Sequence, residues 1–501
     1  MERDRSHGSH NSHNSRGSRG SRGSHDSHDS HDSHREAIEQ HSIDWVPPEE
    51  RHGKPWHLFT VWFSSNVQIT GFVTGVLAVT LGLDLPWAVA TILIGNLVGA
   101  VFMAYHSIQG PRLGVPQMIQ SRAQFGFLGT LLPVLIVLCM YLGFGIEGGV
   151  ITGQAFANWA HIPFTWSVII QGAVPAVIAI VGYKVIHLST RVVSVVSGLL
   201  FLALTFALAG HLPERLPSGP TPSFGTVLLV ISIFVSWQLT WAPYVSDYSR
   251  YLPEDTPSRT TFLWTYAGSA LGSSWVMILG AFAATISAEA VGEDAVGMLS
   301  GQIPALSSAI LLAIVIGIVP AGVYGYYGMY LTAVSAFSAK GHGSATPLVR
   351  AVFIVVSAAL TIAATLMASG HILSTVENIT LFLLYLLVPW TAINLADYYV
   401  VRRGHYDIGE LFRPRGRYGL VNRPAVLIYL VAIAAQIPFI SSSLYTGPLV
   451  DDLGGADISW IVGLVVATVL YLAHARRTGR VARPVGTRAS APDPGAPLSV
   501  D

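Results

Sequence analysis

The stretch WFSSNVQITGFVTG, residues 62–75, lies inside the first long apolar segment and mixes serine, asparagine, glutamine and threonine with two glycines. This composition favours a helix break, because lipid cannot satisfy freed backbone groups and breaks persist where they line a cavity or hold a ligand. The alternative is a continuous helix packed through Gly71 and Gly75. The stretch therefore predicts a membrane helix with a binding site near its middle.

The composition agrees with a protein that crosses the membrane many times. Of 501 residues, 51% are hydrophobic and 11% charged, and the mean hydropathy is +0.52. The 28 basic and 28 acidic residues cancel, which excludes the overall basic field expected of a nucleic-acid-binding protein. The single cysteine, Cys139, excludes an intramolecular disulfide and a multi-cysteine metal site. We expect no metal site and no cofactor.

Twelve apolar segments are long enough to cross a hydrocarbon core, so we expect an all-α integral membrane protein with twelve transmembrane helices. The predicted spans are 57–82, 85–106, 127–157, 163–182, 190–211, 224–247, 262–288, 304–338, 347–370, 376–400, 422–440 and 457–475. The predicted domains are a disordered His/Ser-rich tail over 1–50, a transporter domain over 51–475 and a disordered tail over 476–501. The histidine run in the first tail could chelate a metal weakly, but a solvated low-complexity tail is the simpler interpretation.

The basic residues predict the orientation, because Lys and Arg of short loops stay in the cytoplasm. Among the odd-numbered loops only Arg215 is basic, whereas the tails and even-numbered loops carry many basic residues, among them Arg112, Arg122, Lys184, Arg259, Lys340, Arg402, Arg403, Arg413, Arg415, Arg417, Arg476 and Arg477. We expect both termini in the cytoplasm and the protein in the plasma membrane, without a cleaved signal peptide.

A second break is predicted in the sixth span, where SWQLTWAPYVSDYSRY (residues 236–251) contains Pro243. Spans 1 and 6 are five apart and cross in opposite directions, as an inverted repeat of two five-helix halves requires. Trp237 and Trp241, one turn apart, could stack on a flat ligand or anchor at an interface, and their depth favours stacking.

The third span, with CMYLGFGIEGGVITGQ at residues 139–154, places Glu147 near the membrane centre. A carboxyl group at that depth predicts a proton carrier or a substrate ligand, and the alternative is a protonated structural hydrogen bond. Gly322, Gly325 and Gly328 of the eighth span predict close helix packing. Asp247 and Asp397 end their spans shortly before arginines, which predicts interfacial ion pairs that could act as gates.

Phosphate-binding, dinucleotide-binding and hydrolase motifs are missing from the sequence, so a secondary transporter is favoured over an ATP-driven one. A membrane-embedded enzyme would need several polar catalytic groups at one depth, and Glu147 alone lies deep in a span. A channel is a third alternative, which accumulation of a substrate against its gradient would exclude.

Four ordered motifs resemble the purine-cytosine permeases of the nucleobase-cation-symporter-1 family: residues 62–75, GPRLGVPQMIQSRAQFG at 110–126, WAPYVSDYSRYLP at 241–253, and PWTAINLADYYVVRRGHYDI at 389–408. The resemblance implies a leucine-transporter-type fold, with a 5+5 inverted repeat and two extra helices. It also implies cation-driven uptake of nucleobases, with hydantoin, allantoin, nucleosides or vitamin precursors as alternative substrates. The implied substrate contacts are Gln68, Ile69, Thr70, Gly71, Tyr141, Phe144, Trp237, Gln238 and Tyr324.

We therefore predict a symporter that imports a nucleobase such as cytosine or a purine, with the lipid bilayer and a small heterocycle as its partners. The sequence leaves the oligomeric state open, and a monomer is compatible with the fold. Coupling to protons is favoured over sodium, because the eighth span has no serine, threonine, asparagine or carboxylate between Ser308 and Thr332. Glu147 is the predicted proton carrier.

Overall fold

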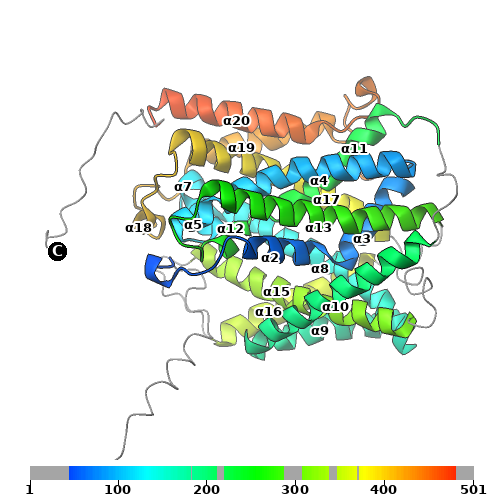
Figure 1. Cartoon of the computed structure of the whole chain (residues 1–501). Coiled ribbons are helices and arrows are strands. Elements are labelled where there is room, and N and C mark those ends of the chain that lie inside the picture. Colours follow the sequence, from blue (N-terminus) through cyan, green and yellow to red (C-terminus); the bar gives the residue numbers. More distant parts are fainter. Residues whose placement is uncertain are drawn as a thin grey trace, which may run out of the picture. The chain divides into compact units, whose positions relative to one another are not determined.

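The computed structural model describes residues 45–181, 183–210, 219–286, 307–337, 347–368 and 372–480. Within these ranges the secondary structure is helical, apart from one isolated bridge between Ser441 and Thr446. Figure 1 shows the long helices running roughly side by side. The all-α prediction is confirmed for the described part of the chain, while most of the two predicted tails lies outside it.

Within the described residues, each predicted span falls on one helix or on two consecutive helices, and in the first and sixth spans a break separates the two. The first half contains η1 (Pro48–Glu50), α2 (His57–Asn66), α3 (Ile69–Thr80), α4 (Leu85–Ser107), α5 (Gln109–Leu113), α6 (Gln117–Gln120), α7 (Arg122–Phe125), α8 (Leu131–Ala160), α9 (Phe164–Val181) and α10 (Tyr183–Ala209). The second half contains α11 (Phe224–Leu239), α12 (Val245–Ser249), α13 (Ser258–Ile286), α15 (Ser307–Phe337), α16 (Pro347–Ala368), α17 (Ile372–Leu395), the π-helix η3 (Ala396–Val401), α18 (Ile408–Leu411), α19 (Arg423–Gln436), η4 (Ile437–Phe439), η5 (Asp451–Leu453) and α20 (Ser459–Arg477).

Seven described helices are long and apolar enough to cross a membrane: Leu85–Leu113, Leu131–Ala160, Ser258–Ile286, Ile310–Ala336, Leu348–Ala368, Leu373–Val401 and Ser459–Arg477. Five shorter apolar helices lie on the remaining predicted spans, at Ile69–Thr80, Phe164–Ile180, Val195–Ala209, Phe224–Leu239 and Arg423–Phe439. The short lengths of the first and fourth of these five follow from the helix breaks described below. The number of twelve crossings stays a prediction.

Helix α13 packs along both α2 and α3. Glycines make the approach possible, since a methyl group on Gly268 or Gly272 would lie within 3 Å of the backbone oxygen of Phe59 or Phe63. A methyl group on Gly280 would collide with the backbone of Phe72, and one on Gly75 with that of Met277. Backbone-to-backbone contact of this kind is how membrane helices gain packing energy where lipid gives no hydrophobic drive.

The start of the helical body lies earlier than predicted. Val46 is fully buried, its N–H donates to the carbonyl of Gly114 at 2.9 Å, and the Arg51 guanidinium donates to the carbonyls of Val46 (2.9 Å) and Pro111 (2.7 Å). Residues 45–50 therefore belong to the folded body and not to a disordered tail, because burying Arg51 requires these carbonyl partners. Helix α20 likewise extends past the predicted boundary to Arg477. In Figure 1, η1 and the C-terminal end of α20 lie at the same end of the body.

Candidate functional site

Both predicted helix breaks are present. Between α2 and α3, Val67 (φ −86°, ψ 78°) and Gln68 (φ −147°, ψ 163°) leave the helical conformation. No side chain caps the N-terminus of α3. Backbone N–H groups at a helix start favour an electronegative partner. The first turn of α3, Ile69 to Gly71, therefore offers donors beside the break.

The second break separates α11 from α12 and contains Pro243. The turn ends at Tyr244, whose φ of −141° lies outside the helical region. Trp237 lies just before this break, in the last turn of α11. A methyl group on Gly71 would lie 3.6 Å from the Trp237 ring, so the indole lies against the start of α3. The two breaks thus meet at Trp237.

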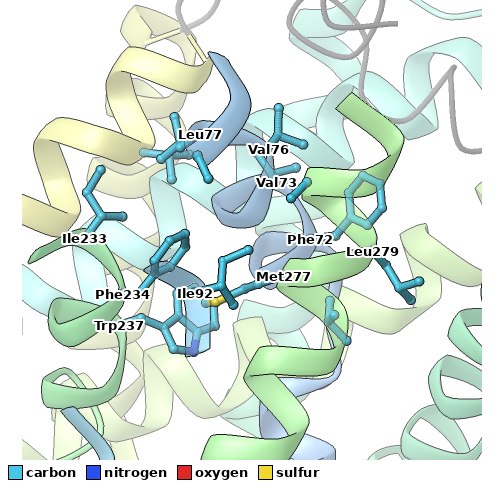
Figure 2. Packing of buried hydrophobic residues seen from close by; sticks show 14 of the residues in the cluster. Phe72, Val73, Val76, Leu77, Ile92, Ile233, Phe234, Trp237, Met277 and Leu279 are labelled. Carbon is cyan, nitrogen blue, oxygen red and sulfur yellow. The ribbon is translucent and has the colours of Figure 1, made fainter. Parts of the chain in front are cut away.

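Asn66, the last residue of α2, holds the Trp237 indole. The indole Nε1–H donates to Asn66 Oδ1 at 2.7 Å, while Asn66 Nδ2 donates to the carbonyl of Trp62 (2.7 Å) and to Ser269 Oγ (3.1 Å). Asn66 is fully buried, and Trp237 is 1% exposed. Figure 2 shows the indole alongside Ile92, Phe234 and Met277. The indole N–H is therefore engaged, and contact between the ring face and a substrate stays a prediction. Asn66 lies within the first motif but is not among the contacts predicted from the sequence, because its partner Trp237 is 171 residues away along the chain.

Two aromatic side chains of α8 approach the same region. Phe144 meets Trp237 edge to face, with ring centroids 6.1 Å apart at 86°. Tyr141 stacks on Tyr244 at 5.8 Å and 29°, and it packs against Gly328 of α15. The predicted residues of spans 1, 3 and 6 are therefore brought together by the fold.

Gln238 follows Trp237 in α11, but its amide points toward α4 and α13. Its Nε2 donates to Asn96 Oδ1 (2.8 Å) and Ser273 Oγ (2.7 Å), and its Oε1 accepts from Ser269 Oγ (2.6 Å). Gln238 is fully buried between α4, α11 and α13. In this conformation the amide joins three helices, so direct reading of a substrate edge by Gln238 would require this network to open. Asn96, Ser269 and Ser273 are polar residues that sequence reasoning did not select.

Tyr324 of α15 contacts a different helix, α9. It packs with Val323 and Tyr326 against Ala176 and Ala179 of α9. A substrate contact at Tyr324 stays a prediction. The neighbouring Gly325 faces open space, because a methyl group there would meet no atom within 4 Å. The close-packing role predicted for the glycine row therefore fits Gly328 and Gly322, whose added methyl groups would touch Tyr141 and Pro175.

Glu147 lies one turn beyond Phe144 in α8 and is 2% exposed. Neither carboxyl oxygen has a hydrogen-bond partner among the described residues. The flanking glycines Gly143 and Gly148 contact Ile379 of α17 and Ile318 of α15. An ionised carboxylate here would lack the partners that buried charges require. The alternative role, a structural hydrogen bond from protonated Glu147, therefore has no acceptor in the described part of the chain.

The two aspartates at the span ends have different surroundings. Asp397 in η3 accepts hydrogen bonds from Gln124 (2.8 Å), Arg402 (2.9 Å), Tyr406 (2.8 Å) and Tyr471 (2.8 Å) and is fully buried. Its predicted ion pair with an arginine is present. Asp247 accepts from the backbone N–H of Gln117 at 2.8 Å, and Arg250 donates to the Asp247 carbonyl at 3.3 Å. A gating role for either residue stays a prediction.

The loop between α4 and α8 closes one end of the body through buried amides. Gln117 Nε2 donates to Gln109 Oε1 (2.9 Å) and Gln120 Oε1 (2.7 Å), while Gln109 Nε2 donates to Asn394 Oδ1 (2.9 Å). Ser246 of α12 donates to Gln117 Oε1 at 2.5 Å. This network ties α5 and α6 to α12 and α17. Among the described residues, no group of three His, Cys, Asp or Glu side chains is arranged to hold a metal ion.

Two broken helices that meet at an aromatic site inside an apolar helical body define the class of broken-helix membrane transporters. The chain belongs to the family of permeases for cytosine/purines, uracil, thiamine and allantoin, whose model matches residues 45–463. It is a multi-pass membrane permease and not an enzyme, and the family resemblance predicted from its four motifs is confirmed.

Relatives and solved structures agree with this assignment. The Bacillus subtilis protein YxlA, named as a candidate purine-cytosine permease, is 40% identical over 442 residues, covering 87% of this chain and 95% of YxlA. The purine-cytosine permease fcyB of Emericella nidulans is 25% identical, covering 87% and 88%. The fold is similar to that of Mhp1, a nucleobase-cation-symport-1 family transporter solved with bromovinylhydantoin bound, with a TM-score of 0.69 at 16% identity over 88% of this chain and 96% of Mhp1.

Proposed function

We propose that this permease imports a flat, nitrogen-rich heterocycle, a nucleobase such as cytosine or a purine, across the plasma membrane by alternating access. The observation that carries the proposal is the Trp237 indole, fixed by Asn66 at the meeting point of the two helix breaks. A fixed aromatic ring binds a planar ring by stacking, and the free N–H groups at the start of α3 suit its carbonyl or ring-nitrogen acceptors. The names of YxlA and fcyB support a nucleobase substrate.

The proposed substrate contacts form three groups. Gln68, Ile69, Thr70 and Gly71 supply backbone donors and acceptors, Trp237 supplies a stacking surface, and Phe144 and Tyr141 form the opposite wall. Gln238 is linked to Asn66 through Ser269, and it would read a substrate edge after this network opens. Tyr324 would contact the substrate from α15 after a rearrangement of that helix.

Proton coupling through Glu147 completes the proposal, with no further cofactor. Its support is a buried carboxyl group that has no hydrogen-bond partner in the described part of the chain and lies one helical turn from the aromatic wall. On the helices packed against α8, the described charged side chains are Glu377 of α17 and Arg350 of α16, and Arg350 donates to the Ile180 carbonyl. A protonated Glu147 can donate a hydrogen bond to a ring nitrogen, which would link proton and substrate through one group.

The proposed topology has twelve spans arranged as two inverted five-helix repeats plus two helices, with both termini in the cytoplasm. The position of η1 and the end of α20 at one end of the body supports it, as does the excess of arginine there. The buried amide network around Gln117 and the Asp397 cluster would then close the cytoplasmic end. A monomer suffices for this mechanism.

The test is uptake of labelled cytosine, adenine, hypoxanthine, uracil, allantoin and thiamine by a host that lacks its own carriers. Accumulation of a nucleobase above its external concentration, competed by related bases, is the expected result. Preferential uptake of allantoin or thiamine would contradict the proposed substrate but would agree with the proposed class of transporter. Equilibration without accumulation would contradict symport.

A further inference from the structure

Eight exposed arginines gather on two segments at one end of the body. They are named here the arginine surface: Arg403, Arg413, Arg415, Arg417 and Arg423 in and after the α17–α19 connection, and Arg476, Arg477 and Arg480 at the end of α20. Arginine is the side chain best shaped to bind phosphate oxygens in pairs.

The acidic residues of the same connection are engaged in holding its shape. Glu410 accepts hydrogen bonds from the Arg417 backbone N–H (2.6 Å) and from Arg413 Nη1 (2.7 Å). Asp407 caps α18 by accepting from the Glu410 N–H at 3.3 Å. The hydrogen bond from the Arg417 backbone, with those of Arg413, holds the pKa of Glu410 below its usual range. Among the described residues, Arg413 is the member of the arginine surface that forms an ion pair.

Two other arginines have a structural role, because they are buried and donate to backbone carbonyls. Arg51 donates to two backbone carbonyls and is buried, and Arg122 donates to the carbonyls of Leu411 (3.1 Å) and Ser335 and is 1% exposed. The eight exposed arginines differ from them in exposure. Their side chains lie on the surface, and the two acids of the α17–α19 connection described above are engaged within it.

The two segments of the arginine surface meet in space. Tyr471 of α20 donates to Asp397 of η3 at 2.8 Å, and Arg480 lies close enough to interact electrostatically with the Tyr471 phenol. Arg402 lies over the rings of Tyr406 and Tyr418, which fixes the connection against η3. Helix α19, which starts at Arg423, packs along α20. The two segments that carry the arginines are therefore held together at this end of the body.

Exposed apolar side chains continue directly from the arginines. Leu420 and Val421 are 39% and 44% exposed just before Arg423, and Leu427 on α19 is 62% exposed. On α20, Val465 and Val469 are more than half exposed before the terminal arginines. Exposed apolar residues on a membrane protein face lipid tails, so the arginines that border them lie at the depth of the headgroups.

We propose that the arginine surface is a binding site for anionic phospholipid headgroups, with acyl chains along the exposed faces of α19 and α20. Basic clusters beside a membrane helix attract anionic lipid, and each arginine near the surface adds to the attraction. Bound lipid would bridge the α17–α19 connection and α20, the two segments that also meet at Asp397.

The experiment uses the purified full-length protein in a neutral detergent, titrated with phosphatidylglycerol or phosphatidylcholine while thermal unfolding is followed. Three variants each remove two positive charges: Arg415→Gln with Arg417→Gln, Arg476→Gln with Arg477→Gln, and the control Lys54→Gln with Arg259→Gln, which are exposed residues outside the surface. We expect phosphatidylglycerol to raise the unfolding midpoint, each arginine pair to weaken its apparent affinity about tenfold or more, and the control to leave it unchanged.

Three results would overturn the proposal: an equal shift with phosphatidylcholine, an equal shift with glycerol phosphate or inorganic phosphate, or an equal loss in the control. A phosphate effect would indicate a site for soluble anions instead of lipid. If an arginine variant has a lower unfolding midpoint even in phosphatidylcholine, its lipid binding is measured by native mass spectrometry instead. The amount of phosphatidylglycerol that it retains is then compared with that of the unmodified protein at a temperature where both are folded. Retention equal to that of the unmodified protein would then contradict the site.

Discussion

At the Trp237 indole, the ring nitrogen and the ring face have separate roles. The nitrogen is held by Asn66, which fixes the angle at which the face meets the break. Removing the ring face removes stacking, which is worth about 1–3 kcal/mol for a base on an aromatic side chain. Removing Asn66 instead leaves the face in place but lets it tilt. The two losses can therefore be measured separately.

For Asn66→Ala we expect the apparent substrate affinity to fall by up to about 150-fold, because a ring that tilts loses part of a stacking interaction worth about 1–3 kcal/mol. Trp237→Phe keeps a ring and removes the N–H that needs Asn66. Combining the two changes should therefore cost less than the sum of their separate effects. Uptake kinetics of the four proteins measure this, and strict additivity would show that Asn66 does not act through Trp237.

The carboxyl group of Glu147 allows a test of coupling that leaves its shape unchanged. Glu147→Gln should retain exchange of substrate across the membrane and lose accumulation driven by a pH gradient, because the amide cannot carry a proton. Counterflow and pH-jump uptake in proteoliposomes measure the two activities. Sodium-dependent accumulation that survives the substitution would refute proton coupling, whereas loss of both activities would assign Glu147 to substrate binding.

At the scale of elements, Asp397 joins η3 to α20 and to the segment before α8. Asp397→Asn should lower the free energy of unfolding by up to about 3–5 kcal/mol, because it leaves Arg402 without its buried partner. Tyr471→Phe removes one hydrogen bond of this cluster and should cost about 1 kcal/mol. Thermal unfolding in detergent measures both. Asp255→Asn, the same charge change at an exposed position, is the control, and an equal effect there would contradict a special role for Asp397.

The helix breaks could be predicted because their signal is local: polar residues, glycine or proline in mid-span. The directions in which the side chains of the site point could not be predicted in this way. A glutamine in the last turn of α11 can face the ligand or the neighbouring helices, and the choice for Gln238 depends on Asn96, Ser269 and Ser273, which lie 31 to 142 residues away along the chain. Asn66 was missed for the same reason. Its importance lies in Trp237, 171 residues later.

For the whole molecule, the side of the membrane on which each terminus lies can be tested. A tag placed at either terminus should be inaccessible to a membrane-impermeant label in intact cells and become accessible after permeabilisation, since the basic residues gather at that end of the spans. A single cysteine introduced near Asp451, with Cys139 replaced by alanine, should be labelled from outside and serves as the control for the opposite face. Labelling of either terminal tag from outside would overturn the orientation.

The way α13 accepts the broken helix has a mechanical consequence. Its glycines receive the backbone of α2 at Phe59 and Phe63 and that of α3 at Phe72, so one uninterrupted helix braces both sides of the gap at Val67 and Gln68. Two short helices joined only by an extended link could move independently, but here both contact α13, so they can move apart only if α13 bends. The break in the first span thus supplies polar backbone groups without making the span flexible. We expect the conformational change of a transport cycle to arise in other helices of the body.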